Sequence, residues 1–216
     1  MKIALCLHGY FDSQQDLTSK GIDGFDYIKK NILDGRDVDV YLHSWEPEKK
    51  DHLIHLYRPK TAIFDEPVDF SNFEEKLNLT GINSPRSGQA ILSHFFSVSE
   101  SLLLSQSNTY DVVIKSRFDL GRINRNTSGP HNSQNPYPVQ CINFNPDLDM
   151  DKFYMANWQY LESDGPADMW FYSSQKNMSN LNQLYKSLIS KYLIADSEYI
   201  KNAPSQKDIL NAIRLY

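Results

Sequence analysis

Cysteine, long apolar runs and excess positive charge are all scarce in this sequence. The two cysteines among 216 residues, Cys6 and Cys141, each lie in a short apolar run, so we expect small core residues and not a disulfide framework. The 27 acidic side chains outnumber the 22 basic ones, and the net charge of -5 argues against nucleic acid as a partner. No apolar run approaches the roughly 18 residues that a membrane span needs. These features predict a cytoplasmic protein.

The composition that is present is that of a globular protein, with 40% hydrophobic and 23% charged residues. The length suits one domain over residues 1–216. Expected strands cover residues 2–7, 37–44, 61–64, 112–114, 139–144 and 168–173, and expected helices cover residues 24–33, 51–57, 84–102 and 178–193. Strands that alternate with helices predict an α/β fold with a mostly parallel sheet flanked by helices.

One stretch, YDVVIKSRFDL at residues 110–120, predicts a site. It reads as a buried strand that carries Arg117 and Asp119 just beyond its C-terminal end. Ligands of open α/β sheets bind at the carboxyl ends of the strands. This charged pair is therefore a candidate binding site, and the polar residues 124–138 that follow it are a candidate lid or acceptor-site loop.

Two further segments could contact a nucleotide. The first expected strand ends in His8-Gly9-Tyr10, and such a turn can bring backbone N–H groups to the sheet edge, although no GxGxxG motif is present. Ser84 can cap the third expected helix, which places Arg86 at its positive end, where an arginine suits a phosphate. Arg86 could equally cover the helix start or pair with a carboxylate.

Other motifs give weaker indications. The acidic strings at residues 37–39 and 147–149 match a DxD pattern, but the first begins its strand and the second follows a turn, so neither lies at the carboxyl edge. We interpret the second string as a solvated helix start. His52 and His55 lie three residues apart on an expected helix, and without a third ligand they are interpreted as surface residues.

The segment YDVVIKSRFDL, together with DVDVYLHSW before it and ADMWFYSSQKNMSNL after it, resembles a known family. It is similar to the small GT-A-type glycosyltransferases of bacterial polysaccharide loci and of large DNA viruses such as the chlorella viruses. The resemblance extends over residues 2–193, and its most specific part is residues 117–119. It implies a GT-A-like, Rossmann-like fold and a UDP-sugar donor.

The resemblance also implies roles for particular residues. In the family, Mn²⁺ or Mg²⁺ bridges the donor diphosphate to the last aspartate of a DxD motif, and Asp119 matches that aspartate. Arg117 stands where the first aspartate is usual, which implies either that it contacts phosphate or sugar or that metal dependence is weakened. Asp168 matches an acid that reaches the donor sugar. From the residues alone, Asp119 could instead be a cap or an ion-pair partner of Arg117, and Asp168 could be a cap.

The expected function is metal-assisted transfer of a hexose, with UDP-glucose the favoured donor, to a glycan or glycoprotein acceptor. Retention of the anomeric configuration is the favoured stereochemistry, although the sequence identifies no residue as a general base. Two alternatives stay open. A nucleotidyltransferase-like enzyme would release pyrophosphate instead of UDP, and a non-catalytic carbohydrate-binding module would use exposed aromatic rings, first those of Trp45, Trp158 and Trp170.

Overall fold

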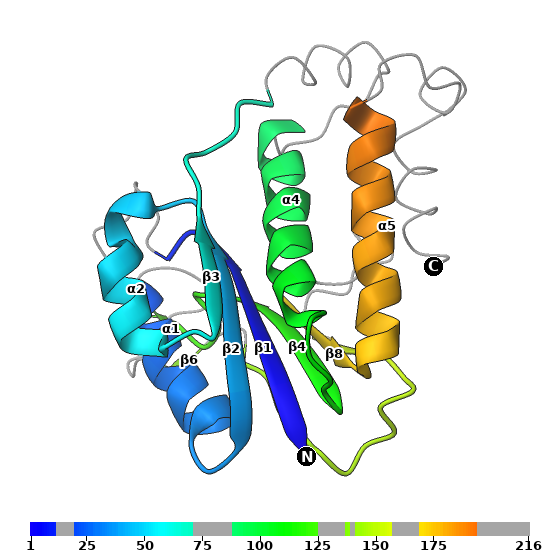
Figure 1. Ribbon diagram of the computed structural model, residues 1–216. Helices are drawn as coiled ribbons and strands as arrows, with labels where there is room; N and C mark the ends of the chain where they lie inside the picture. The colour runs from blue at the N-terminus through cyan, green and yellow to red at the C-terminus, as the bar shows by residue number, and fades with distance from the viewer. Residues whose placement is uncertain (12–19, 71–87, 125–136, 139–140, 157–168, 194–216) are drawn as a thin grey trace, which may run out of the picture.

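A computed structural model describes residues 1–11, 20–70, 88–124, 137–138, 141–156 and 169–193 (Figure 1). Their centre is a six-stranded sheet with the order β3-β2-β1-β4-β8-β7. Its strands are β1 (Lys2–Gly9), β2 (Asp37–Ser44), β3 (Thr61–Phe64), β4 (Val112–Arg117), β7 (Tyr154–Met155) and β8 (Trp170–Ser173). Strands β1 to β4 are parallel, and β8 runs antiparallel to both of its neighbours. A short pair, β5 (Ile123–Asn124) and β6 (Tyr137–Pro138), forms a separate antiparallel ribbon.

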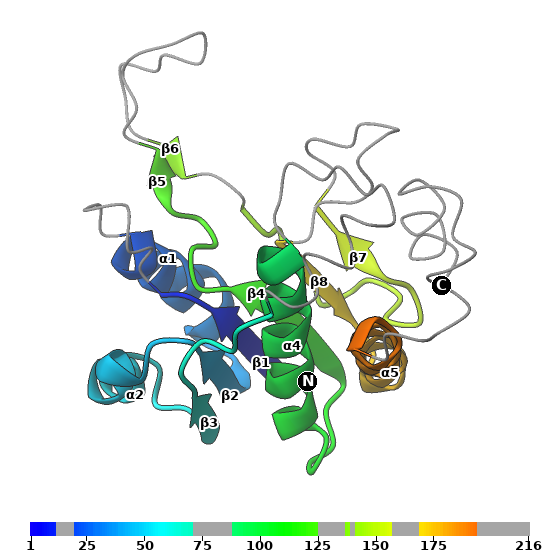
Figure 2. The same ribbon diagram turned by 90° about the horizontal axis from the view of Figure 1, so that it is seen from above.

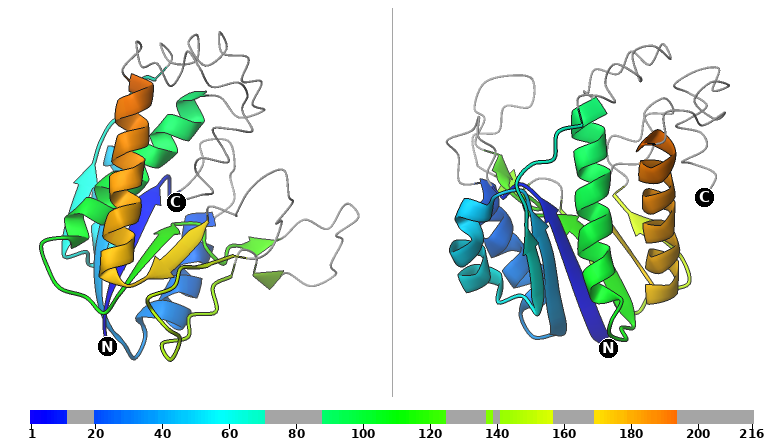
Figure 3. Two further views of the ribbon diagram at one scale, coloured as in Figure 1. Left: turned by 90° about the vertical axis from the view of Figure 1, so that its right-hand side faces the viewer. Right: turned by 45° about the horizontal axis from the view of Figure 1, so that its top comes forward.

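Helices cover both faces of this sheet. They are α1 (Lys20–Ile28), which continues into a π-helical turn (Lys29–Leu33), α2 (Lys50–Tyr57) after a 3₁₀ turn (Pro47–Lys49), α4 (Gly88–Ser105) and α5 (Gln175–Leu193). Helices α4 and α5 lie side by side on one face, and α1 lies on the other (Figures 2 and 3). The predicted mixed, mostly parallel α/β architecture is thereby confirmed, and it is compatible with a Rossmann-like fold. None of the described helices is long and apolar enough to span a bilayer.

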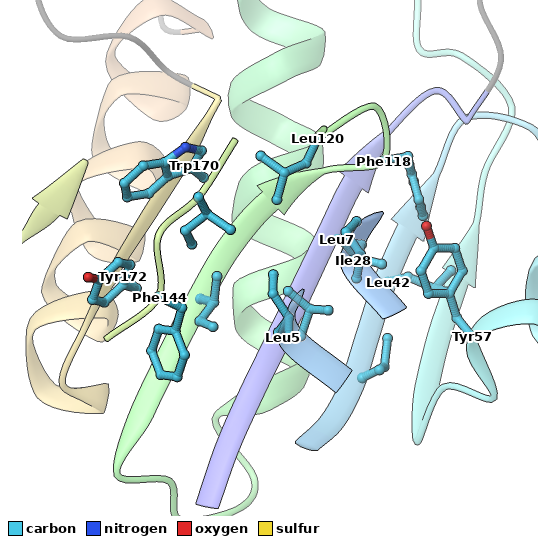
Figure 4. Close-up of a cluster of buried hydrophobic side chains, with 14 of the residues drawn as sticks. Leu5, Leu7, Ile28, Leu42, Tyr57, Phe118, Leu120, Phe144, Trp170 and Tyr172 are labelled. Carbon is cyan, nitrogen blue, oxygen red and sulfur yellow. The ribbon is translucent and has the colours of Figure 1, made fainter. Parts of the chain in front are cut away.

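The central strands are apolar because both of their faces are buried. Along β1, Ile3, Leu5 and Leu7 pack toward α1 and α2, whereas Ala4 and Cys6 belong to the cluster beneath α4 and α5. Figure 4 shows the larger cluster, in which side chains from β1, β2 and α1 meet residues from beyond the end of β4 and from β8. This packing fixes the ends of β1 and β4 next to each other.

The sequence places several element bounds correctly. The strands predicted at residues 37–44 and 61–64 coincide with β2 and β3, and the 168–173 prediction contains β8. The helices predicted at residues 24–33, 51–57 and 178–193 correspond to α1 with its π-helical turn, to α2 and to α5. His52 and His55 are exposed on α2, as predicted.

Two predictions around residue 141 are wrong. Residues 141–145 form no strand, although Ile142 and Phe144 are buried in the larger cluster. The carbonyl of Ile142 accepts a hydrogen bond of 2.9 Å from the Tyr27 hydroxyl, so a side chain supplies a partner that a neighbouring strand would otherwise provide. Cys141 is exposed and, of the two cysteines, only Cys6 is a core residue.

The acidic string at residues 147–149 is exposed as expected, but it lies in a turn and starts no helix.

Candidate functional site at the carboxyl edge of the sheet

The candidate site lies where the strand order reverses. From β1 the sheet extends through β2 to β3 on one side and through β4 on the other, so β1 and β4 flank a topological switch point. In register, His8 of β1 stands between His43 of β2 and Arg117 of β4. Ligands of open α/β sheets bind outside the carboxyl ends of the strands at such a point. The structure thus brings together His8, Gly9, Tyr10 and Arg117, which the sequence had singled out separately.

Arg117 and Asp119 form a two-point ion pair. The guanidinium donates from Nε to Oδ1 and from Nη2 to Oδ2, both at 2.9 Å, and the Asp119 side chain is only 8% exposed. Arg122 approaches Oδ2 at 3.5 Å, because Gly121 adopts a φ of +73° and turns the chain back. Asp119 is therefore held by two cations, and the ion-pair alternative is the one that the structure shows. Arg122 was not singled out from the sequence, although its i+3 spacing from Asp119 and the glycine between them are local signals.

The described residues do not fit a divalent metal at Asp119. Mn²⁺ and Mg²⁺ require several oxygen ligands, and both oxygens of this carboxylate already accept hydrogen bonds from guanidinium groups, whose positive charge repels a second cation. Within the described ranges, no group of three or more His, Cys, Asp or Glu side chains is placed to hold a metal ion. Asp119 thus serves as the counter-charge of the two arginines.

The turn after β1 does not present its backbone donors to a ligand in the way the sequence suggested. The N–H of Gly9 donates to Ser97 Oγ at 2.9 Å, and the N–H of Phe11 donates to the carboxylate of Glu46. Glu46 is buried, and its negative charge would repel a phosphate at this turn. Gly9, with φ +96°, also accepts a hydrogen bond from Trp45 N–H. The turn is thus fixed by protein groups on several sides, and Tyr10 between them is 42% exposed.

His8 is a buried histidine with unused hydrogen-bonding capacity. It is 1% exposed, and neither Nδ1 nor Nε2 makes a hydrogen bond to any residue that the structure describes. Its ring meets that of His94 edge-on, with 5.0 Å between centroids. Burial, and then the positive charges of Lys115 and other neighbours, hold the pKa of His8 well below its usual value. The neutral ring carries one donor and one acceptor, but both nitrogens are buried and do not face a ligand in this structure.

His43 forms the best-connected polar group at this edge. Its Nδ1 lies 2.7 Å from Ser97 Oγ, and its Nε2 lies 3.2 Å from Asp65 Oδ2. The ring is fully buried against Trp45, with centroids 4.6 Å apart. Sequence reasoning missed all three members. A histidine in a buried strand next to a carboxyl end was a usable signal for His43, whereas nothing near Ser97 or Asp65 indicated that they would meet it.

Some predicted site residues receive no test. Arg86, Asp168 and Trp158 lie outside the described residues, and their roles stay predictions. Met169, which follows Asp168, accepts a hydrogen bond of 3.2 Å from Arg117 N–H through its carbonyl. Trp45 and Trp170 are buried, so their rings do not provide the exposed stacking faces that a carbohydrate-binding module requires.

No family model and no curated protein sequence matches this chain. The site therefore has to be interpreted from its own chemistry. On the β4 side it offers two arginines that share one carboxylate, and on the β1 side it offers an exposed tyrosine in a fixed turn, with the neutral and buried His8 between the two. This distribution suits a ligand with an anionic part and an uncharged aromatic part.

Proposed function

We propose that this chain is a glycosyltransferase that moves a hexose from a UDP-sugar, UDP-glucose in the first place, to a glycan or glycoprotein acceptor. The observation that supports it most directly is the pair Arg117 and Arg122 at the β1/β4 switch point, where Rossmann-like sheets bind nucleotides. The resemblance of residues 110–120 to GT-A-type enzymes supports the same conclusion independently of the geometry.

In this proposal the arginines bind the donor diphosphate. Arg117 engages Asp119 through Nε and Nη2, and its Nη1 makes no hydrogen bond within the described part of the chain. The side chains of Arg117 and Arg122 are 41% and 30% exposed, so both can reach a ligand while Asp119 keeps them oriented. A guanidinium is well suited to phosphate because its planar fork donates two parallel hydrogen bonds. The same charges stabilise the diphosphate as it leaves the sugar.

The nucleoside then lies toward the β1 turn. The Tyr10 ring is exposed there and supplies a flat apolar surface for the base. Burial and the neighbouring Glu46 raise the pKa of the Tyr10 hydroxyl, so it stays uncharged and adds no repulsion to the diphosphate. Arg86 and Asp168 lie outside the described residues, and we propose for them the roles that the sequence predicts, Arg86 at the nucleotide and Asp168 at the sugar.

Calorimetric titration with UDP, in EDTA and in Mn²⁺, tests the proposal. We expect binding in EDTA, and Arg117→Ala should weaken it about tenfold or more, because it removes a charged hydrogen-bond donor. Lys30→Ala is the matched control: it removes the same charge from an exposed position of the π-helical turn and should leave the affinity unchanged. Failure of the wild-type protein to bind UDP in either buffer would refute the proposal.

The reaction product distinguishes the proposal from the nucleotidyltransferase alternative. With UDP-glucose and a mixture of glycan acceptors, the proposed enzyme releases UDP. Release of pyrophosphate from a nucleoside triphosphate and a sugar phosphate, without UDP formation, would favour the alternative instead.

A further inference from the structure

We infer that His43 is a positioning residue: with Asp65 and Ser97 it forms a hydrogen-bonded chain that fixes the backbone of Gly9 at the donor site, and it does so as a neutral imidazole. The inference rests on the proposed function for what the site binds. The chain itself is a property of the described residues and can be tested without a ligand.

The direction of each hydrogen bond follows from the partners. Gly9 N–H can only donate, so Ser97 Oγ accepts at 2.9 Å. The single proton of Ser97 is then available to His43 Nδ1 at 2.7 Å, which must carry no proton, and Nε2–H donates to the Asp65 carboxylate at 3.2 Å. The Ser97 hydroxyl has no other acceptor among the described residues. One tautomer of neutral His43 therefore satisfies every group in the chain.

Ser97, His43 and Asp65 are the residue types of a nucleophilic triad, but their placement excludes that role. Ser97 is fully buried in the middle of α4, and its Oγ is occupied by the Gly9 N–H. A nucleophile must reach a substrate carbonyl or phosphoryl group. The chain therefore acts on the protein backbone. It links Asp65, just after β3, and His43, at the end of β2, through Ser97 of α4 to the turn that carries Tyr10.

Protonation of His43 would weaken this chain. A proton on Nδ1 would make Ser97 Oγ accept from two donors, Gly9 N–H and Nδ1–H, and would leave the buried serine proton without its acceptor. Burial lowers the pKa of His43 more than its hydrogen bond to Asp65 raises it, so the ring is neutral near pH 7. The titratable groups around it are Asp65 beyond β3 and His8 on β1, and Asp65 in turn contributes to the raised pKa of Glu100 on α4. Acidification should therefore loosen the Gly9 turn.

Amide exchange tests the chain in the ligand-free protein. The Gly9 amide should exchange about tenfold faster in Ser97→Ala than in wild type, because its acceptor is gone. Ser101→Ala is the matched control, since Ser101 is equally buried one turn further along α4 and its Oγ donates only within the helix, to the Val98 carbonyl at 2.9 Å. Equal Gly9 exchange in both variants and wild type would overturn the inference.

Binding of UDP-glucose tests the consequence for the site. Its diphosphate diester stays fully ionised between pH 5 and 8, so a pH effect in this range comes from the protein. Ser97→Ala should raise the Kd about fivefold to tenfold, and Ser101→Ala should not. His43→Asn keeps an acceptor near Nδ1 but cannot titrate. It should bind within about threefold of wild type at pH 7.5 and lose much of the wild-type weakening on acidification.

The outcomes separate the two proposals. If wild-type protein does not bind UDP-glucose at any pH, the proposed function fails, and the Gly9 exchange still decides whether the chain exists. If UDP-glucose binds and His43→Asn keeps the full pH dependence of the wild type, the positioning role of His43 is refuted while the proposed function stands.

Discussion

Asp119 is the residue whose environment contributes most to the interpretation of the site. Its carboxylate is nearly buried and accepts two hydrogen bonds from Arg117, so Asp119→Asn removes the charge that compensates two guanidinium groups. Because the arginines are partly exposed, we expect a loss of about 1–2 kcal/mol in the free energy of unfolding, measured by urea denaturation. Asp34→Asn is the control. Its pair with Lys29 is exposed, and the expected loss is below about 0.5 kcal/mol.

Asp119→Asn also tests whether Asp119 binds a metal ion. With Asp119 occupied by arginines, Mn²⁺ should add little to UDP affinity in the wild type, and Asp119→Asn should change that small effect little. If Mn²⁺ strengthened UDP binding in the wild type and not in the variant, Asp119 would be a metal ligand as the family resemblance implies, and its pair with Arg117 would have to open on binding.

Among the elements, helix α1 can pack closely against the end of β4 because residue 24 is a glycine. A Cβ atom at Gly24 would lie 1.9 Å from the carbonyl oxygen of Phe118, next to Asp119. Glycine to alanine inside an exposed helix normally stabilises by up to ~1 kcal/mol. Here the sign should reverse, because the rigid backbone of the site has to move, and we expect Gly24→Ala to destabilise by about 2 kcal/mol or more.

A thermal or urea denaturation series would check this sign. Asp26→Ala is a suitable control, because Asp26 is an exposed position of the same helix and should change stability by less than about 0.5 kcal/mol. A Gly24→Ala protein as stable as the wild type would show that α1 is not in close contact with Phe118.

For the whole molecule, buried neutral histidines predict a loss of stability in mild acid. The pKa values of His8 and His43 are lowered in the folded protein, so between their ordinary value near 6.5 and the folded value the unfolded chain binds more protons. Stability should fall as the pH drops below about 6.5, by about 1.4 kcal/mol per pH unit for each such histidine. Asp39, whose pKa is lowered by its hydrogen bonds to Lys60 and Tyr110, matters only at more acidic pH.

Urea midpoints at pH 7.5 and pH 5.5 measure this slope. His8→Gln should reduce the difference between the two midpoints, whereas His55→Gln, at an exposed position on α2, should leave it unchanged. A pH-independent midpoint in the wild type would mean that His8 and His43 bind protons equally in the folded and the unfolded protein, and it would contradict the lowered pKa values.

The limits of prediction from sequence have physical reasons that these residues illustrate. Strands β2 and β3 were predicted with their bounds because alternating or apolar runs end in local turn signals. The antiparallel direction of β8 was not predicted, since direction depends on distant pairing with β4. The segment after residue 141 was mistaken for a strand because buried apolar side chains do not require a ladder. His43, Ser97 and Asp65 meet only after α4 has packed on the sheet, so no local pattern reveals them.

The central place of β1 also has a consequence during synthesis. It pairs with β2 on one side, but its partner on the other side is β4, which ends 73 residues after Ser44. At a synthesis rate of ~5–20 residues per second, that edge of β1 stays unpaired for roughly 4 to 15 s until β4 has been synthesised. An unpaired, apolar strand edge is a template for association with other chains. We therefore expect chains truncated before β4 to require chaperones or to aggregate, and soluble expression to begin only with chains that extend to Arg117.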